Sequence, residues 1–483
     1  MDLAIKQKPR GFVFGVGGLD SLLGESLRPG SLLVVAGHPG AGKTTLGATM
    51  CLANAVRGNR CLYFSVQEPR EKLYANMKRI GIDLEEAENR GLLRFIKLPL
   101  VSDPDAARDV LNEIGSQAAE QGASVVIVDS VTPVLKAVRD SVKSRSVLQE
   151  FFATLPMLLQ GIVVLLAEIP IIEERVELGD IEFVADTILL LTHRIEKNRL
   201  VREIVIRKAR GSPLTIARVP FAITEKGLRV WAPPNLETIP ALDTNKVYKL
   251  PCDVLRRTIG PLYGGMSVYI SYPVDARPYH VMPILMGISV YNNAKTLIIT
   301  YTYSPSQIIN LLLKAFSKWE PYNERTISLL REKMNEVFEI KAFNPSAYSV
   351  EELYAQEMLL ISKVKPDIVV FFGTDALSRY NSQGELTDLL RNQTLFLKSM
   401  GSLIFRLGSN VSENVYVMNS QISDAVIRFS YVSNNWLSGN KGDLTMYIWV
   451  SGLDPVILDQ DKIQRCGVEA MLEIRRKLLQ GGG

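Results

Sequence analysis

Cysteine is scarce in this sequence, and the few that occur do not cluster. The 483 residues contain four, Cys51, Cys61, Cys252 and Cys466, with no Cys-x-x-Cys pair and no grouping of cysteine with histidine. This spacing predicts neither a zinc site nor a disulfide framework. A reducing compartment, the cytoplasm, is therefore the expected location.

Long apolar runs are also missing. The longest, at 161–167 and 188–191, are far shorter than the roughly 20 apolar residues that a membrane span needs. The starting segment MDLAIKQKPRG lacks the apolar core of a signal peptide. We therefore expect a cytoplasmic protein with no membrane partner.

Charge of one sign is not in excess. The chain has 55 Lys and Arg against 51 Asp and Glu, a net charge of +4. So small a surplus gives no general electrostatic signal for nucleic acid or anionic membranes. Hydrophobic residues make up 47% and charged residues 22%, a balance typical of folded globular proteins.

A glycine-rich segment between a buried strand and a helix carries the strongest functional signal. The apolar run 32–36 predicts a strand buried on both faces, and the residues after Lys43 have helical spacing. Between them lies Gly37-x-x-x-x-Gly42-Lys43-Thr44, the Walker A pattern, in the strand-to-helix context that this motif requires. A ligand-free β–α turn would not need this spacing or the Lys-Thr pair.

The motif predicts a site for ATP and Mg²⁺. Its glycines let the backbone turn tightly and point N–H groups at phosphate oxygens. Lys43 would contact the β and γ phosphates, and the Thr44 hydroxyl would bind Mg²⁺. The predicted nucleotide-binding residues are Gly37, His38, Pro39, Gly40, Ala41, Gly42, Lys43, Thr44 and Thr45.

Two carboxylates at the ends of other predicted strands complete this site. The apolar run 125–128 ends in Asp129, the expected place of a Walker B acid that binds Mg²⁺. The predicted strand 61–66 is followed by Gln67 and Glu68, and a carboxylate there could activate the attacking water. Glu68 could instead be a loop residue before a helix that begins near Arg70.

These landmarks resemble the KaiC-type ATPases of the RecA superfamily. The similarity also includes GGLDSLLG from Gly17, DSVTPVL from Asp129, IRKARG from Ile206 and PFAITEKGLRVW from Pro220, in the order found in that family. It covers about the first half of the chain. The resemblance implies an α/β fold of the RecA-like P-loop type, with a mainly parallel sheet flanked by helices.

The resemblance also implies roles for three further residues. The family's acidic pair after the second core strand holds the hydrolytic glutamate, and here only Glu68 is acidic, which implies slow hydrolysis. Lys208 and Arg210 match the family's lysine-x-arginine finger, which reaches the γ-phosphate of a neighbouring subunit. That finger implies a homo-oligomeric ring, expected to be a hexamer. An exposed basic turn before Gly211 is the alternative for this pair.

The second half of the sequence is a fainter copy of the first. GMSVYIS from Gly265 aligns with the strand before the Walker A loop, which predicts domains at 1–235 and 236–483. In this copy Pro278 takes the place of Lys43, Gly373 that of Asp129, and Ser304 that of Glu68. We therefore expect a second RecA-like domain without nucleotide motifs, a pseudo-ATPase kept for structure, assembly or protein partners.

The segment from Trp319 to Tyr354 is rich in charge and looks like an insertion. Its apolar residues have helical spacing, so we expect a surface helix and a loop. A docking element for a partner is the alternative.

Nucleic acid is the main competing partner. A basic cluster, Lys136, Arg139, Lys143 and Arg145, follows the Walker B segment, but no aromatic residue lies among them for base stacking. We therefore expect a KaiC-like, magnesium-dependent, slow ATPase in a ring, acting in regulation or assembly. A DNA-binding ATPase of recombination or repair and a non-hydrolysing ATP-dependent scaffold remain as alternatives.

Overall fold

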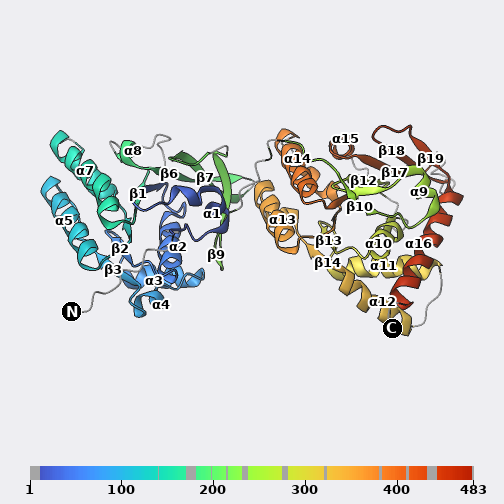
Figure 1. Ribbon diagram of the computed structural model, residues 1–483, viewed down its shortest axis with the longest axis horizontal. Helices are drawn as coiled ribbons and strands as arrows, with labels where there is room; N and C mark the ends of the chain where they lie inside the picture. Colours follow the sequence, from blue (N-terminus) through green and yellow to red (C-terminus); the bar gives the residue numbers. More distant parts are fainter. Residues whose placement is uncertain are drawn as a thin grey trace. The chain divides into compact units, whose positions relative to one another are not determined.

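The chain folds into two compact units, Met1–Asn235 and Leu236–Gly483, shown in Figure 1. The structure, a computed structural model, describes residues 11–139, 141–169, 181–196, 198–213, 216–230, 236, 238–274, 281–319, 324–379, 383–409, 413–431 and 443–480. Each unit is described separately below.

The first unit is built on a nine-stranded sheet in the order β3-β2-β4-β5-β1-β6-β7-β8-β9. The strands from β3 to β6 pair in parallel, and β7, β8 and β9 are added antiparallel. Continuous burial along the central strands accounts for their unbroken apolar runs. The strands are β1 (Ser31–Gly37), β2 (Cys61–Ser65), β3 (Leu93–Lys97), β4 (Val125–Asp129), β5 (Ile162–Glu168), β6 (Thr187–Glu196), β7 (Arg199–Ala209), β8 (Arg218–Thr224) and β9 (Gly227–Val230).

Helices cover both faces of this sheet. One apolar core lies between the sheet and α2, and a second lies on the other face under α5, α6 and α7 (Figure 1). Asp103 caps α5 by accepting hydrogen bonds from the backbone N–H groups of Asp105 and Ala106. The helices are α1 (Gly17–Leu23), α2 (Lys43–Val56), α3 (Arg70–Arg79), α4 (Leu84–Asn89), α5 (Pro104–Glu120), α6 (Thr132–Val138), α7 (Val142–Leu159) and α8 (Ile181–Val184).

The second unit repeats this plan with an eight-stranded sheet in the order β14-β13-β15-β16-β12-β17-β18-β19. Its central strands are again parallel, and β10 pairs with β11 in a separate two-stranded sheet. The strands are β10 (Asp243–Tyr248), β11 (Leu262–Gly264), β12 (Ser267–Tyr272), β13 (Thr296–Thr300), β14 (Phe338–Ala342), β15 (Ile368–Phe372), β16 (Leu403–Ser409), β17 (Ala425–Tyr431), β18 (Leu444–Val450) and β19 (Val456–Leu458).

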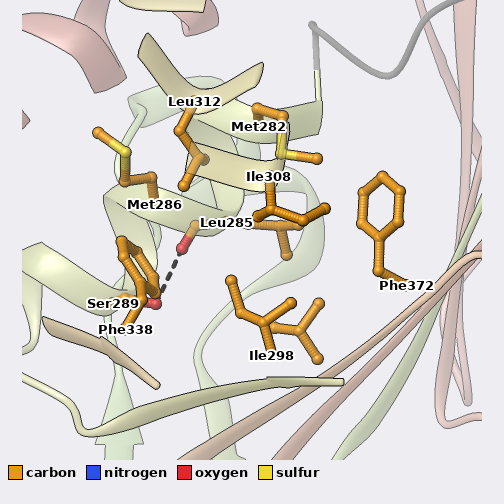
Figure 2. A pocket seen from close by; sticks show the side chains of 10 residues that line it. Met282, Leu285, Met286, Ser289, Ile298, Ile308, Leu312, Phe338 and Phe372 are labelled. Atoms are coloured by element: carbon orange, nitrogen blue, oxygen red, sulfur yellow. Dashed lines mark hydrogen bonds between the residues drawn. The ribbon is translucent and has the colours of Figure 1, made fainter. Parts of the chain in front are cut away.

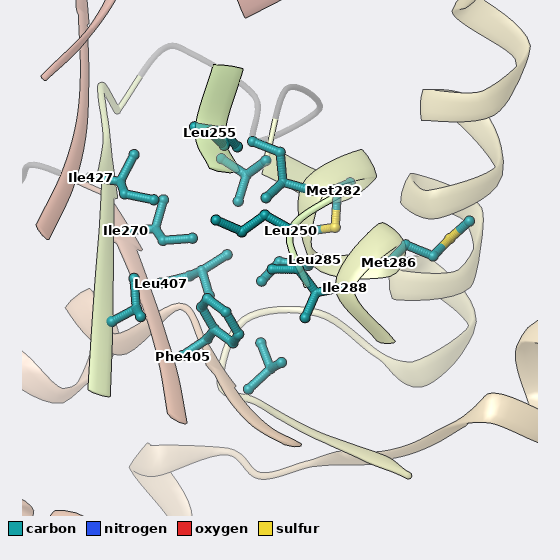
Figure 3. Close-up of a cluster of buried hydrophobic side chains, with 14 of the residues drawn as sticks. Leu250, Leu255, Ile270, Met282, Leu285, Met286, Ile288, Phe405, Leu407 and Ile427 are labelled. Carbon is teal, nitrogen blue, oxygen red and sulfur yellow. The ribbon is translucent and has the colours of Figure 1, made fainter. Parts of the chain in front are cut away.

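The main apolar core of the second unit lies between its sheet and the buried helix α10. Figure 3 shows Met282, Leu285 and Ile288 of α10 facing Ile270 and Phe405 of the sheet. Helices α13 and α14 pack together in the same unit, and α16 packs on α10. The helices are α9 (Asp253–Ile259), α10 (Val281–Tyr291), α11 (Pro305–Trp319), α12 (Glu324–Val337), α13 (Val350–Val364), α14 (Gln383–Ser399), α15 (Glu413–Gln421) and α16 (Gln460–Gln480).

The same side-chain clamps recur in the two units. Asp186 accepts a hydrogen bond from the backbone N–H of Leu32 at 3.0 Å, and Asp424 accepts one from that of Ser267 at 2.8 Å. These hydrogen bonds show that β12 is the counterpart of β1 in the repeat. The order of the strands around β12 agrees with the order around β1. The predicted α/β fold with two RecA-like, mainly parallel sheets is confirmed.

An asparagine clamp relates the helices that follow these central strands. The Asn54 amide donates to the backbone oxygens of Val13 and Met50, both at 2.7 Å. The Asn292 amide likewise donates to the oxygens of Lys249 at 2.9 Å and Ile288 at 2.7 Å. The two clamps align α10 with α2.

The prediction that 319–354 is an insertion is wrong. Strand β14 lies inside this segment and pairs with β13, as β3 pairs with β2 in the first unit. The segment therefore belongs to the repeated core. It was mistaken because β14 is short and only its first residue is buried, so it has no strong strand pattern.

The prediction that the cysteines form no disulfide framework is also wrong. Cys51 on α2 is bonded to Cys61 on β2, and Cys252, before α9, is bonded to Cys466 on α16. All four are buried. The second pair is separated by 214 residues, so only the fold brings its members together.

Among the described helices, none is both long and apolar enough to cross a membrane.

Candidate functional site

The Walker A loop connects β1 to α2 at the carboxyl edge of the first sheet. Gly42 has φ +105° and precedes the first residue of α2, a conformation that favours glycine. At Gly37, an added Cβ would lie 2.3 Å from the backbone oxygen of Leu191. The loop therefore needs glycine at both positions, and its path leads into the amino end of α2.

Lys43 is folded back onto this loop. Its Nζ donates to the backbone oxygens of Gly37 at 2.9 Å and His38 at 3.0 Å. Burial lowers its pKa, while the nearby charges of Glu168 and Asp129 act in the opposite direction. The ammonium group is thus held within the glycine-rich loop, where phosphate oxygens could replace the two carbonyl groups.

Asp129 lies at the end of β4, facing the amino end of α2. Its Oδ2 accepts a 2.7 Å hydrogen bond from the Tyr63 hydroxyl, and its carboxylate is also hydrogen-bonded to the Thr44 side chain. Burial raises the pKa of Asp129, and the hydrogen bonds from Tyr63 and Thr44 partly counteract this effect.

The neighbouring oxygens of Thr44 and Asp129 fit Mg²⁺. This ion prefers oxygen ligands and is usually held by one or two carboxylates together with substrate phosphates. Within the described ranges, no group of three or more His, Cys, Asp or Glu side chains could hold a metal by itself. The residues present therefore suit a magnesium ion that arrives with a nucleotide.

Glu68 follows β2, but its carboxylate is engaged by α3. Oε1 accepts a 3.2 Å hydrogen bond from the Asn76 amide and lies 3.9 Å from Nζ of Lys72. The backbone of Glu68 is fixed by Ser65, whose hydroxyl donates to its oxygen at 2.7 Å. Helix α3 begins at Arg70, so Glu68 lies in the loop before this helix. This position agrees with the alternative expectation for Glu68.

Arg210 lies at the end of the sheet opposite the Walker A loop, and Lys208 lies level with the middle of β1. Lys208 pairs with Ile188, which pairs with Val34, and the Arg210 N–H bonds to the oxygen of Asp186 beside the start of β1. From there to the loop is nearly the whole length of β1, about 17 Å at the usual rise per residue.

Both side chains bind α8 and its carboxyl end. Lys208 donates to the backbone oxygen of Glu182 at 2.8 Å, and Arg210 donates to that of Phe183 at 2.9 Å. Arg210 also lies 3.5 Å from the Asp186 carboxylate. Burial lowers the pKa of Lys208, and the charge of Arg210 adds to this effect.

The basic cluster after Asp129 is only partly exposed. Lys136 and Arg139 lie at the end of α6 and Lys143 near the start of α7, all on the surface. Arg145 is half-buried. Three of the four predicted cations are therefore exposed, and the fourth is partly covered.

Residues not predicted from the sequence also lie around the loop. The ring of His193 on β6 meets that of His38 edge to face, with centroids 6.2 Å apart, and burial lowers the His193 pKa. Tyr63 contacts Asp129 from the next strand. The available signal was a tyrosine inside an apolar strand, because a buried hydroxyl usually needs a hydrogen-bond partner.

The second unit has apolar residues at the corresponding positions. The asparagine clamps align Thr44 with Met282 and Lys43 with Val281, and strand pairing aligns Tyr63 with Ile298 and Asp129 with Phe372. In Figure 2, Met282, Ile298 and Phe372 surround an apolar cavity of about 10 Å³. This volume has room for about one water molecule.

The alignment of Gly373 with Asp129 is therefore wrong by one residue. The Val66 N–H bonds to the oxygen of Asp129, as the Tyr301 N–H bonds to that of Phe372. The alignment of Ser304 with Glu68 is also wrong by one residue, because strand register aligns Thr300 with Ser65 and therefore Tyr303 with Glu68. Pro278 lies outside the described residues.

The order of strands, the Walker A loop and the carboxylate at the end of β4 agree with a known family. The KaiC ATPase family matches residues 13–235. This part of the chain is a KaiC-like domain of the RecA superfamily. The residues predicted to form the nucleotide site all lie within the matched segment.

Three relatives illustrate the extent of this similarity. The circadian clock oscillator protein KaiC of Thermostichus vulcanus is 29% identical over 218 residues, which are 45% of this chain and 41% of that protein. A UPF0273 protein of Methanopyrus kandleri is 25% identical over 45% of this chain and 90% of its own length. The KaiC-like domain thus also resembles a nearly complete smaller protein.

The third relative aligns with both units. The circadian clock protein KaiC3 of Synechocystis sp. is 22% identical over 438 residues, which are 86% of this chain and 83% of that protein. In contrast, the chain spans only about two fifths of the length of the KaiC protein above.

Proposed function

We propose that the first unit binds ATP with Mg²⁺ and hydrolyses it slowly, within a homo-oligomeric ring that acts in regulation or assembly. The observation that carries this proposal is the Asp129 carboxylate, hydrogen-bonded to Thr44 at the end of the Walker A loop. A carboxylate beside such a loop would supply a magnesium ligand next to the phosphates. The KaiC-like match over the same residues supports it.

Each residue would have a distinct role in the bound state. The loop from Gly37 to Gly42 would donate backbone N–H groups to the phosphates, as the amino end of α2 favours. Lys43 would exchange its two carbonyl contacts for phosphate oxygens. Thr44 and Asp129 would hold Mg²⁺, which supplies positive charge to the β and γ phosphates.

The position of Glu68 supports slow hydrolysis. A general base must reach the attacking water directly or through one other water. Here Asn76 and Lys72 engage the carboxylate, and Gln67 cannot replace it as a base. Turnover would then require Glu68 to leave its contacts with α3.

The position of Lys208 and Arg210 supports a ring. Arg210 lies beside the start of β1 and Lys208 level with its middle, and α8 holds both side chains instead of the Walker A loop of the same chain. Cations stabilise the charge of a transferring phosphoryl group, so these two would serve a site in a neighbouring copy. A hexamer is the proposed state. We propose the cytoplasm as the location because ATP is available there, although disulfides such as the two found here are uncommon in that compartment.

The second unit would support assembly or bind protein partners without binding nucleotide. Val281, Met282 and Phe372 replace the cation and both magnesium ligands there. One nucleotide per chain is the expected stoichiometry.

In the scaffold alternative, ATP joins subunits without turnover. One observation favours it: the Glu68 carboxylate is engaged by Asn76 and Lys72. One experiment separates it from a slow ATPase: purified protein is incubated with Mg²⁺ and ATP, then bound nucleotide, released ADP and mass in solution are measured. The proposal requires one bound ATP per chain, more released ADP than the Lys43→Ala variant gives, and a mass that corresponds to a ring. Retained ATP without ADP would favour the scaffold, and no bound ATP would reject both.

A further inference from the structure

We propose that Tyr63 is a positioning residue for Mg²⁺, acting through the carboxylate of Asp129. This inference rests on the proposed function of the first unit. Tyr63 would not touch the nucleotide or the metal; its hydroxyl would fix one oxygen of Asp129 so that the other faces the ion. Partners of metal ligands commonly set ligand orientation in this way.

Strand register brings the two side chains together. In the parallel pair β2 and β4, Tyr63 lies opposite Ile127 and Ser65 lies opposite Asp129. Since side chains alternate along a strand, Ile127 and Asp129 share the face that carries Tyr63. That face packs against α2, whose first turn holds Thr44.

The contacts of Asp129 divide between two elements. Oδ2 accepts the Tyr63 hydroxyl at 2.7 Å, from inside the sheet. Thr44 bonds to the same carboxylate from the amino end of α2. A nucleotide-bound metal that recruits Thr44 would leave Tyr63 as the contact that still holds the carboxylate in place.

Tyr63 is well fixed to perform this role. It is 1% exposed, and its ring stacks on Phe95 of β3 with centroids 6.2 Å apart and an angle of 12°. Phe95 in turn meets Tyr74 of α3 edge to face at 6.1 Å. The hydroxyl therefore has little freedom, and a rigid donor orients its acceptor well.

The second unit provides a natural comparison. Ile298 stands in place of Tyr63 where Phe372 stands in place of Asp129. Apolar residues thus replace both Tyr63 and Asp129 in the second unit, where the counterpart of Thr44, Met282, is also apolar. Elsewhere this unit keeps the clamps made by Asp424 and Asn292. The Tyr63 hydroxyl is therefore present only in the unit that has the proposed metal ligands, whereas the clamps are present in both units because the fold needs them.

The test is Tyr63→Phe, which removes the hydroxyl and keeps the ring. Mn²⁺ serves as a probe for Mg²⁺, and its affinity for the ATP-bound protein is measured by electron paramagnetic resonance. We expect affinity to fall about tenfold, as is common when the partner of a metal ligand is lost. Affinity for ATP in the presence of EDTA should stay within twofold of the unmodified protein.

Tyr74→Phe is the matched control, because it removes a hydroxyl from the same aromatic group without touching Asp129. It should leave Mn²⁺ affinity unchanged. In an Asp129→Asn background, Tyr63→Phe should have no further effect on Mn²⁺, because the residue acts through the carboxylate. Mn²⁺ affinity within twofold of normal in Tyr63→Phe, or an equal loss in Tyr74→Phe, would overturn the inference.

Retained ATP binding in EDTA shows that Tyr63→Phe is folded. If that variant does not fold, Phe95→Leu takes its place, because it removes the ring that stacks on Tyr63 and loosens the hydroxyl without deleting it: unchanged Mn²⁺ affinity in folded Phe95→Leu would contradict the role of a rigidly held Tyr63. If the unmodified protein binds no ATP, the proposed function itself fails. If it binds ATP and Mn²⁺ normally and Tyr63→Phe does too, only the role of Tyr63 is rejected.

Discussion

The hydroxyl of Thr296 donates a 2.9 Å hydrogen bond to the hydroxyl of Ser289, at the positions that Cys51 and Cys61 occupy in the first unit. Both pairs join the helix after the central strand to the second core strand. The same contact is thus covalent in one unit and a hydrogen bond in the other.

This correspondence predicts the cost of exchanging one pair for the other. Cys51→Ser with Cys61→Thr should fold, and the first unit should lose about 1–3 kcal/mol of unfolding free energy, the range for a short disulfide loop. Denaturant unfolding, followed by hydrogen exchange in β2 and β4, measures this loss. A reducing agent should destabilise the first unit of the unmodified protein but not that of the double variant. Equal sensitivity of both would show that this disulfide contributes nothing to stability.

A second prediction concerns pH and a buried acid in the second unit. Glu357 is 3% exposed and accepts hydrogen bonds from the Tyr301 hydroxyl and the Gln393 amide, both at 2.7 Å. Burial raises its pKa to about 7, above the ordinary 4.5, and the hydrogen bonds and the buried Arg406 oppose this rise.

Because the folded state binds this proton more tightly than the unfolded state, folding is favoured when Glu357 is protonated. This contribution is complete below about pH 4.5 and is lost as the pH rises to about 7, by at most ~3 kcal/mol. Hydrogen exchange in β15 and β16 between pH 5 and 8 should show it. Glu357→Gln should flatten the profile; an unchanged slope would assign the effect to other groups.

A third prediction separates binding from chemistry. Glu68→Gln should leave ATP affinity nearly intact and slow hydrolysis at least tenfold, because only the water-activating group is lost. Glu71→Gln, on the exposed first turn of α3, removes the same charge nearby and should have little effect. Asn76→Ala, which frees the Glu68 carboxylate, should raise the rate. A normal rate in Glu68→Gln would place the base elsewhere.

A fourth prediction tests the shared site. Lys43→Ala should abolish ATP binding, and Lys208→Ala with Arg210→Ala should bind ATP without hydrolysing it. Mixed rings contain interfaces that join an intact finger to an intact loop, so mixtures should regain activity. Mass measurement confirms that the two variants assemble together. No recovery at any mixing ratio, despite such assembly, would leave the pair as a basic turn that holds α8.

Local motifs made the candidate site predictable from the sequence, whereas contacts between distant segments could not be predicted. The Walker A loop and Asp129 have strong sequence patterns because each follows an apolar strand at a fixed spacing. In the sequence, Tyr63 cannot be distinguished from other core residues. Only the strand register shows that it lies beside Asp129. Glu68 was expected to face the water, but the sequence does not reveal that Asn76, nearly two turns into α3, would engage it.

The same limit explains the errors in the second unit. Ser130 shifts the alignment by one residue after β4, so counting along the sequence chose Gly373, whereas backbone hydrogen bonds identify Phe372. The short β14, at the edge of its sheet, looked like a loop because only its first residue is buried. In both cases the deciding information lies in pairing between strands.

The bond between Cys252 and Cys466 has a mechanical consequence. A pulling force applied to the two ends of the oxidised chain would pass directly across this bond. The 214-residue loop that it closes would carry no load, and roughly 700 Å of potential extension would stay hidden. Only reduction would release that length, so the bond acts as a bypass for tension around most of the second unit.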